Sequence, residues 1–441
     1  MKYLLMSILM LAALNTFGQQ VVRMQTFHDS ASTVLKEDFY VKLGADTLKN
    51  GPYSSFYTSG KKMATGKFTN GKNDSTWTEY YETGGVKLTL PYQNGIKNGT
   101  FRIYYPTGAL MQEGFYENDQ QTGTFKTYNE HGALVTEATF VNGFPEGVVK
   151  EYYPSGKIKS EISYKNQKQN GVAKTWYSNG NPETEANFKD GLASGYQKVW
   201  YDNGNLETEA YSTNGKKQGV FKNYFRSGKL KAEGSYKNGA LHGIARSYYE
   251  NEKPRSEVPY KEGKINGAAK YFSETGTLES EIKYSNDEKD RKITRYFGNG
   301  QIAETEEYKN NLRTGTWKKY YENKQLRVSE PYLNDKLNGD KLLYHENGKP
   351  AEKTTYLNGR IIDKSFRYYP SGQLLSEQAY KSGVKYGPYK EFSETGKIAL
   401  EGQFLSGKET GKWKYYNEQE KVTRIVTYKN GVILAEKEMK K

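Results

Sequence analysis

The sequence repeats itself every 24 residues. Steps of 24 from Gly51 give sixteen repeats that fill residues 51–434 without an insertion or deletion, and we number the positions of each repeat from 0 to 23. Position 5 is aromatic in all sixteen repeats, position 17 is aromatic in fifteen, and position 9 is usually glycine. Self-similarity at a fixed period indicates one supersecondary unit stacked on copies of itself.

Each repeat reads as two short strands joined by tight turns. Turn sets such as Pro154-Ser155-Gly156-Lys157, and Asn-Gly pairs such as Asn70-Gly71, supply the positive φ angles that hairpin turns need. The segments between them are rich in Tyr, Thr, Val and Ile and alternate with period two, which predicts strands. The expected fold is therefore all-β, an elongated array of about sixteen 24-residue antiparallel β-hairpins that form a long twisted sheet.

Composition agrees with a thin sheet. Hydrophobic residues make up 35% of the chain, too few for several thick cores, while aromatic residues make up 14%, too many for a disordered chain. Most globular enzymes are excluded by this combination.

Variation among the repeats predicts the register of the hairpins. With a loop at positions 7–10, position 6 faces 11, position 3 faces 14 and position 2 faces 15. Position 3 is basic and position 14 acidic in nine repeats, and opposite charges are favoured cross-strand neighbours. Five of these pairs are expected to be structural: Lys126/Glu137, Lys150/Glu161, Lys174/Glu185, Lys198/Glu209 and Lys222/Glu233.

This register assigns the side chains to two faces. One face should carry positions 2, 6, 11, 15 and 17, and the other positions 3, 5, 12 and 14. The aromatic side chain at position 5 then lies opposite the denser apolar face, unless a bulge turns it inward. The sequence leaves both arrangements open.

The net charge of +14 raises the question of an anionic partner. The basic row at position 3 is mostly neutralised by the acidic row at position 14, which weakens a nucleic-acid interpretation. Much of the excess lies at position 18, in Lys165, Lys189, Lys237, Lys261, Lys309, Lys381 and Lys429. Charge rows on a sheet are typical of solvated surfaces that oppose aggregation. We expect no nucleic-acid partner.

The two ends of the chain differ from the repeats. Residues 1–18 are typical of a secretory signal peptide, with Lys2, an apolar run from Leu4 to Leu14, and small residues at Thr16 and Gly18 before a cleavage site. Residues 19–50 are expected to form a linker and capping strand, and 435–441 a charged tail. No stretch is long enough to be a transmembrane segment. The chain is therefore expected to be exported, periplasmic or secreted, and cleaved after Gly18.

Residues that carry chemistry are scarce. The chain has no cysteine, and its four histidines fall at unrelated positions without metal-ligand spacing. The glutamates recur as a row matched to lysines, so a structural role is favoured over a catalytic pair. We expect no metal, no cofactor and no enzymatic activity.

The recurring pattern G-x-W-K-x-Y-Y-x-x-G-x-L-x-x-E-x-x-Y-x-N-G, clearest at 147–164, 219–239 and 315–321, resembles the MORN repeat variant of bacterial proteins. Such proteins are often labelled YwqK-family antitoxin components. The resemblance covers residues 51–434. It implies antiparallel hairpin rods that tether membranes, dimerise or scaffold partners.

The leading hypothesis is an exported interaction scaffold that binds unidentified protein partners through exposed aromatic side chains. The candidate surface is the position 5 row: Tyr80, Tyr104, Tyr128, Tyr152, Trp176, Trp200, Tyr224, Tyr248, Tyr296, Tyr320 and Tyr368. The alternative to a binding role is that these rings only pack against the sheet. Binding of envelope polysaccharide, or immunity against a partner toxin, are the other functions that the sequence allows. A homodimer also stays open.

Overall fold

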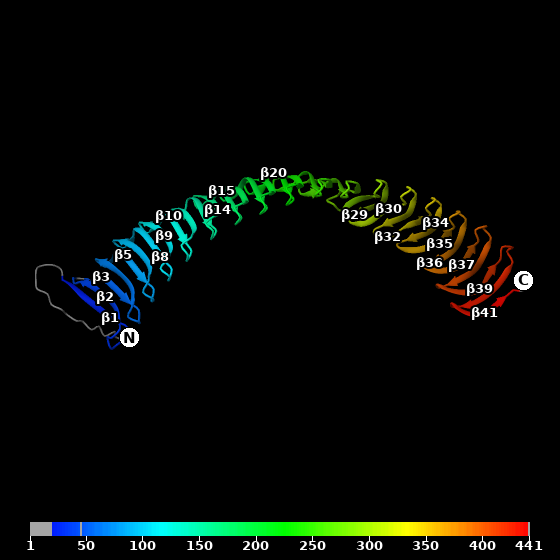
Figure 1. Ribbon diagram of the computed structural model, residues 1–441. Coiled ribbons are helices and arrows are strands. Elements are labelled where there is room, and N and C mark those ends of the chain that lie inside the picture. The colour runs from blue at the N-terminus through cyan, green and yellow to red at the C-terminus, as the bar shows by residue number, and fades with distance from the viewer. Residues whose placement is uncertain (1–19, 45, 440–441) are drawn as a thin grey trace. The chain divides into compact units, whose positions relative to one another are not determined.

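The computed structural model describes residues 20–44 and 46–439, so the predicted signal peptide lies outside the described residues. The described residues form strands and turns without a helix, and the strands belong to one antiparallel sheet (Figure 1). This confirms the predicted all-β hairpin array. The chain divides into a first half, residues 1–217 with 226–228, and a second half, residues 218–225 with 229–441, each described by itself.

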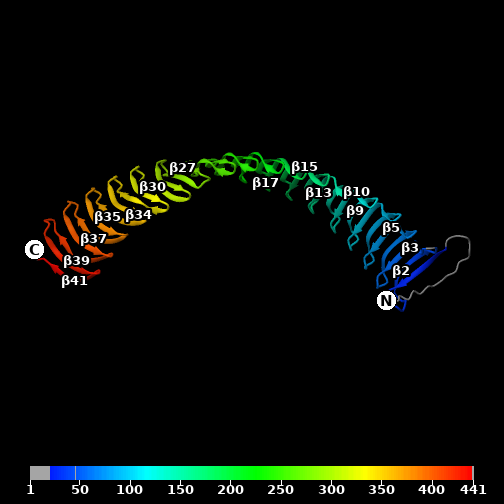
Figure 2. The same cartoon turned by 180° about the vertical axis from the view of Figure 1, so that it is seen from behind.

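In the first half, every hairpin lies beside the next one in chain order (Figures 1 and 2). Its strands are β1 Val21–Phe27, β2 Leu35–Lys42, β3 Leu48–Phe56, β4 Lys62–Thr69, β5 Lys72–Tyr80, β6 Val86–Gln93, β7 Ile96–Lys97, β8 Gly99–Tyr104, β9 Leu110–Glu117, β10 Gln120–Tyr128, β11 Leu134–Val141, β12 Phe144–Pro145, β13 Gly147–Tyr152, β14 Ile158–Lys165, β15 Lys168–Trp176, β16 Pro182–Lys189, β17 Leu192–Trp200, β18 Leu206–Thr213 and β19 Lys216–Lys217.

The second half follows the same plan. Its strands are β20 Gly219–Tyr224, β21 Leu230–Lys237, β22 Ala240–Leu241, β23 Gly243–Tyr248, β24 Pro254–Lys261, β25 Lys264–Ile265, β26 Gly267–Phe272, β27 Leu278–Ser285, β28 Asp290–Tyr296, β29 Ile302–Lys309, β30 Leu312–Tyr320, β31 Leu326–Leu333, β32 Lys336–Leu337, β33 Gly339–Tyr344, β34 Pro350–Leu357, β35 Arg360–Tyr368, β36 Leu374–Lys381, β37 Val384–Phe392, β38 Ile398–Leu405, β39 Lys408–Tyr416, β40 Val422–Lys429 and β41 Val432–Glu438.

The register inside a hairpin is shown by β15 and β16. Lys174 pairs with Glu185 and Ala173 with Ala186, in agreement with the register predicted for positions 3 with 14 and 2 with 15. The predicted pairing of position 6 with 11 is wrong. Trp176 at position 5 pairs with Pro182 at position 11, because the register shifts by one residue after Thr175.

The cause of this bulge is the turn. The N–H of Tyr177 donates to the carbonyl of Asn181 at 2.9 Å, and the N–H of Gly180 donates back to the carbonyl of Tyr177 at 2.8 Å. Position 6 therefore belongs to the turn rather than to the strand, and position 12 becomes the extra residue of a β-bulge.

Neighbouring hairpins join through a second irregularity, at position 0. Glu161 pairs with Lys174 of the next repeat, but pairing is interrupted between Ile162 and Tyr164. Gly171 lies at this interruption with φ of +108°, and a Cβ there would lie 3.1 Å from the Cβ of Ser163. A positive φ and this close approach both favour glycine, which explains its recurrence at position 0.

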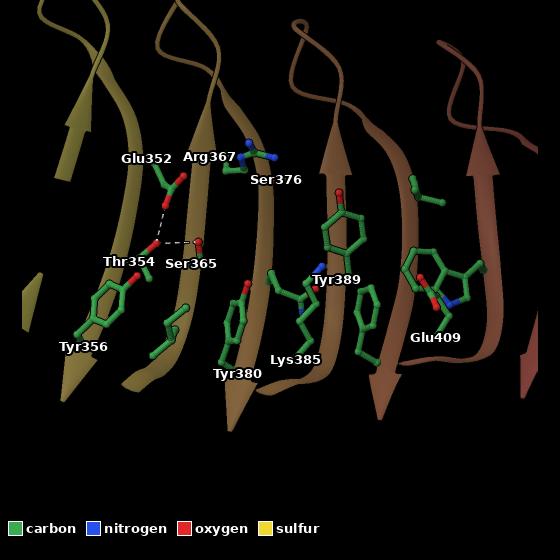
Figure 3. Close-up of a pocket in the computed structure, with 15 residues that line it drawn as sticks. Glu352, Thr354, Tyr356, Ser365, Arg367, Ser376, Tyr380, Lys385, Tyr389 and Glu409 are labelled. Atoms are coloured by element: carbon green, nitrogen blue, oxygen red, sulfur yellow. Dashed lines mark hydrogen bonds between the residues drawn. The ribbon is translucent and has the colours of Figure 1, made fainter. Parts of the chain in front are cut away.

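The core is a row of side chains on one face of the sheet, from positions 2, 15 and 17. Phe101 is only 4% exposed, and its ring centroid lies 5.1 Å from that of Tyr116 and 5.7 Å from that of Phe125. Figure 3 shows the aromatic row farther along the chain, where Tyr356 of β34, Tyr380 of β36 and Tyr389 of β37 stand on the same side of the sheet. A one-sided row of rings is the thin core that the composition indicated.

Candidate interaction surface

The bulge decides which side chains share a face. Directly paired residues point to the same side of a sheet, so position 11 lies beside position 5. Position 12 lies beside position 4 instead, as the 3.4 Å ion pair between Lys87 and Glu79 shows. The predicted placement of positions 11 and 12 is therefore wrong: the two are exchanged. We call positions 1, 3, 5, 11, 14 and 16 the charged face, and positions 2, 4, 12, 13, 15 and 17 the aromatic face.

The position 5 row lies on the charged face, opposite the denser apolar face. The hydroxyl of Tyr128 donates to Oε1 of Glu113 at 3.0 Å, and that of Tyr248 to Oε1 of Glu233 at 2.9 Å. Burial, followed by the hydrogen bond to Glu113, raises the pKa of Tyr128. The bulge leaves the ring beside the charged rows instead of turning it toward the aromatic core.

Every candidate at position 5 is half-buried. Tyr152 donates to Glu137 over 3.4 Å, and the hydroxyl of Tyr80 lies 3.3 Å from that of Thr65. Tyr296 and Tyr320 line a hollow of about 390 Å³. The remaining half-buried members are Tyr104, Trp176, Trp200, Tyr224 and Tyr368. Each of these rings therefore packs partly against its neighbours and leaves part of its surface exposed to solvent.

The five charge pairs lie directly opposite one another in the hairpins. Three of them form ion pairs, with N–O distances of 3.4 Å for Lys126/Glu137, 3.2 Å for Lys150/Glu161 and 3.3 Å for Lys174/Glu185. The other two are register neighbours, Lys198 with Glu209 and Lys222 with Glu233. Glu137 and Glu161 raise the pKa values of Lys126 and Lys150.

Four of these glutamates also face a basic residue of the following repeat, which is a lysine for Glu137, Glu161 and Glu185 and an arginine, Arg246, for Glu233. Glu137 pairs with Lys150 across β11 and β13, and Glu161 pairs with Lys174 across β14 and β15. The two charged rows therefore alternate across the sheet, which the within-hairpin prediction did not include. Little of the positive charge at position 3 is left for an anionic partner.

The second tyrosine of the Tyr-Tyr pair, at position 6, links consecutive repeats. The hydroxyl of Tyr177 donates to the backbone carbonyl of Trp200 at 2.8 Å. His345 occupies position 6 of its own repeat, and its Nε2 lies 3.0 Å from the carbonyl of Tyr368. The sequence predicted that position 6 lies in a strand opposite position 11, so this structural role was missed. The sequence signal for this role was the tyrosine that recurs at position 6, directly after the aromatic residue that is present at position 5 of every repeat.

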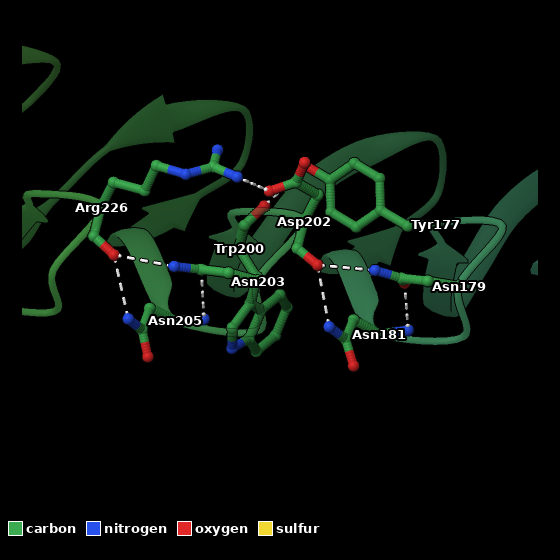
Figure 4. A network of polar contacts seen from close by, with 8 residues as sticks. All are labelled: Tyr177, Asn179, Asn181, Trp200, Asp202, Asn203, Asn205 and Arg226. Carbon is green, nitrogen blue, oxygen red and sulfur yellow. Dashed lines mark hydrogen bonds and ion pairs between the residues drawn. The ribbon is translucent and has the colours of Figure 1, made fainter.

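A polar ladder runs beside these hydroxyl contacts at the turns (Figure 4). Asn179 and Asn181 both donate their side-chain amides to the carbonyl of Asp202, at 2.7 and 2.8 Å. One repeat later, Asn203 and Asn205 donate to the carbonyl of Arg226, whose guanidinium pairs with the Asp202 carboxylate. The polar side chains of these turns therefore hydrogen-bond to the turn of the next repeat.

Exposed apolar side chains lie on the charged face at positions 1 and 16, and others lie near the turns between repeats at positions 18 and 21, such as Leu333 and Leu192. Val148 is 44% exposed, Val172 37%, and Tyr196 62%. Tyr196 pairs with Tyr211, and the two rings meet edge to face at 5.1 Å. We call Val148, Val172, Tyr196 and Tyr211 the apolar patch. The second half repeats the feature at position 1 with Val220 and Ile244.

No group of His, Asp or Glu among residues 20–44 and 46–439 is arranged to hold a metal ion. No helix in the same ranges could cross a membrane.

The MORN repeat variant pattern matches fifteen segments of this chain. They are residues 73–94, 97–118, 121–142, 145–166, 169–190, 194–216, 217–238, 241–262, 265–286, 292–310, 313–334, 337–358, 364–382, 385–405 and 409–430. The chain belongs to the MORN repeat variant family. The resemblance to the MORN repeat variant is confirmed over residues 73–430, while the YwqK antitoxin label stays a prediction.

Comparison with individual proteins adds little. No curated protein matches this MORN repeat chain. Among solved structures, the TcdB2–TccC3 complex matches at 11% identity and a TM-score of 0.15, over 92% of this chain and 28% of the other. A Photorhabdus luminescens Tc holotoxin pore matches at 12% identity and a TM-score of 0.14, over 92% of this chain and 27% of the other. The chain spans about a quarter of the length of these structures.

Proposed function

We propose that this MORN repeat protein is an exported, non-enzymatic scaffold that binds protein partners through its charged face. The apolar patch carries the proposal. Val148, Val172 and Tyr196 occupy the same position in three consecutive repeats, and strands about 4.8 Å apart space them roughly 10 Å from one another. An apolar row at this spacing suits an extended partner.

The surroundings of the patch also suit a protein interface. Lys174, Glu185 and Lys198 lie two residues away on the same face, and the half-buried Trp176 and Trp200 follow them. Aromatic anchors inside a polar rim are typical of interfaces in which a few residues supply most of the binding energy. Export is supported by the sequence of residues 1–18.

Site-specific photo-crosslinking tests the binding. A photoreactive phenylalanine analogue replaces Tyr196 in the full chain, and Leu357, 51% exposed at position 18 away from the patch, serves as the matched control site. We expect one protein to crosslink from position 196 and not from position 357. Equal crosslinking from both sites would overturn the proposal.

Introducing negative charges into the apolar patch is a second test of protein binding. Val172→Glu with Tyr196→Glu should reduce recovery of the crosslinked partner at least tenfold, because a carboxylate would have to be desolvated in the interface. Leu333→Glu with Leu357→Glu introduces the same charge at equally exposed positions and should leave recovery unchanged. Cell fractionation with and without residues 1–18 tests export separately.

A further inference from the structure

On the aromatic face of the second half, position 2 carries a ring in four repeats and none in the other five. Position 2 is Ser365 in the repeat that begins at Asp363, whereas Tyr389 and Trp413 hold this position in the next two repeats. A hollow of about 430 Å³ lies where the ring is missing (Figure 3). This volume falls within the range of small-molecule sites.

Aromatic side chains line one side of the hollow. The ring centroids of Tyr389 and Trp413 are 5.7 Å apart, and Phe404 meets Trp413 edge to face at 5.2 Å. Tyr380 lines the hollow from the neighbouring strand β36. Phe404 and Trp413 are only 8% and 5% exposed, so they hold Tyr389 in place, and the half-buried Tyr380 and Tyr389 form the accessible part of this apolar wall.

The floor of the hollow is polar and nearly inaccessible. Thr354 is 2% exposed, while Ser376 and Gln378 are each 5% exposed. The hydroxyl of Thr354 lies 3.0 Å from that of Ser365 and donates to Oε1 of Glu352 at 3.0 Å. This floor is built from consecutive strands, β34 to β36, rather than from a mobile loop.

Gln378 lies in the floor of the hollow, and the hydrogen bonding of its side chain is incomplete. Its Nε2 donates to the carbonyl of Ala379 at 2.7 Å, but its Oε1 is buried without a hydrogen-bond partner among the described residues. Most repeats carry an apolar residue or glycine at this position, such as Gly114, Ala138 or Val258. A buried acceptor without a partner is unfavourable, and a ligand with a hydroxyl or amide donor would satisfy it.

The rim of the hollow carries no net charge. Glu352 and Glu409 are balanced by Arg367 and Lys385, and the Lys385 ammonium lies 4.8 Å from the centroid of Phe404. A strongly charged ligand would therefore meet as much repulsion as attraction. A purely apolar ligand would leave the floor unsatisfied.

We propose that this hollow binds a neutral pyranose ring of a glycan. The C–H face of the sugar would stack on Tyr380 and Tyr389, and its hydroxyls would hydrogen-bond to the floor, one of them donating to Oε1 of Gln378. The site is on the aromatic face, so it goes beyond the proposed protein binding on the charged face and does not depend on it.

Titration calorimetry of the full chain with maltotetraose, cellotetraose and chitotetraose tests the proposal. We expect saturable binding of at least one of them. The variant Ser365→Phe with Gln378→Gly installs the ring-and-glycine pair that Phe101 and Gly114 form elsewhere, so it fills the hollow and should weaken that binding at least tenfold. Ala173→Phe with Ala186→Gly makes the same change in a repeat of the first half and should bind like the wild type.

A second variant guards against a folding defect. Gln378→Met keeps the length of the side chain without its amide, and should weaken binding at least tenfold without lowering the thermal midpoint. Absence of binding by all three tetrasaccharides would overturn the proposal, as would equal binding by the filled variant. Tyr196→Glu should bind sugar like the wild type, so that failure of the protein-binding proposal is seen separately.

Discussion

The hydroxyl of Tyr153 donates a hydrogen bond to the backbone carbonyl of Trp176, with 2.6 Å between the two oxygens. The same contact recurs with the period of the sequence, in Tyr57/Tyr80, Tyr81/Tyr104, Tyr105/Tyr128, Tyr177/Trp200, Tyr249/Phe272, Tyr321/Tyr344 and Tyr369/Phe392. Each bond joins the turn of one hairpin to the strand end of the next. The two tyrosines of a Tyr-Tyr pair therefore differ in role.

This difference predicts unequal effects of removing the two hydroxyls. Tyr153→Phe should destabilise the surrounding repeats by about 1 kcal/mol, because it leaves the carbonyl of Trp176 without this donor. Tyr152→Phe should cost less than about 0.5 kcal/mol, since its 3.4 Å contact with Glu137 is long and partly solvated. Hydrogen exchange of β13 to β15 measures both, because a repeat contacts mainly its neighbours. A larger loss for Tyr152→Phe would contradict the assignment.

Gly114, at position 15, lies beneath rings from both neighbouring strands. A Cβ on Gly114 would lie 2.7 Å from Cδ2 of Phe125 and 2.8 Å from Cε1 of Phe101. Gly114→Ala should therefore destabilise this region by about 1–3 kcal/mol through overpacking. The control is Gly298→Ala, where nothing lies within 4 Å and φ is not positive. That substitution should be neutral or slightly stabilising, and hydrogen exchange of β8 to β10 and of β28 to β29 measures the two effects.

The pairing of positions 3 with 14 and 2 with 15 could be predicted because paired residues vary together. Charge at position 3 accompanies charge at position 14, as in Lys174 and Glu185, and a ring accompanies a small residue, as in Phe101 and Gly114. Cross-strand neighbours interact directly, so this information is carried by the amino acids themselves.

The bulge and the exposed surface could not be predicted in the same way. The shift after Thr175 depends on backbone hydrogen bonds in the turn, and the glycine at position 9 marks the turn without showing where the register shifts. The role of Tyr177 depends on a contact with the following repeat, which composition within one repeat does not encode. The apolar patch did leave a signal, since Val148, Val172 and Tyr196 share one position, but period-two alternation alone gave that position no special weight.

Position 9 of the turn offers a stabilising substitution. Most repeats have glycine there, with φ angles such as +80° at Gly156, but Lys324 adopts φ of +72° with an L side chain. The left-handed region costs a non-glycine residue about 1–2 kcal/mol, partly offset by the greater freedom of glycine in the unfolded chain. Lys324→Gly should stabilise the hairpin of β30 and β31 by up to about 1 kcal/mol. Lys336→Gly, a lysine-to-glycine change at a residue without positive φ, should not stabilise.

Acid should weaken the last repeats through Glu401. Hydrogen bonds from Tyr416 at 2.7 Å and Lys414 at 3.0 Å, aided by the charge of Lys414, lower the pKa of this carboxyl below its ordinary value of 4.5. A carboxyl whose pKa is lowered on folding stabilises the fold above its unfolded pKa, and this contribution is lost as the pH falls through the folded pKa. Because the side chain is 28% exposed, the contribution at pH 7 should be at most about 1 kcal/mol.

Hydrogen exchange or denaturant unfolding of the wild type and Glu401→Gln at pH 7, 5 and 3 measures this contribution. The wild type should be more stable at pH 7 and 5, and its advantage should shrink at pH 3, where protonated Glu401 resembles the amide. Tyr416→Phe removes the larger cause of the shift and should make the pH dependence shallower. A difference between wild type and Glu401→Gln that stays constant from pH 7 to 3 would mean that the carboxylate is not held by these two donors.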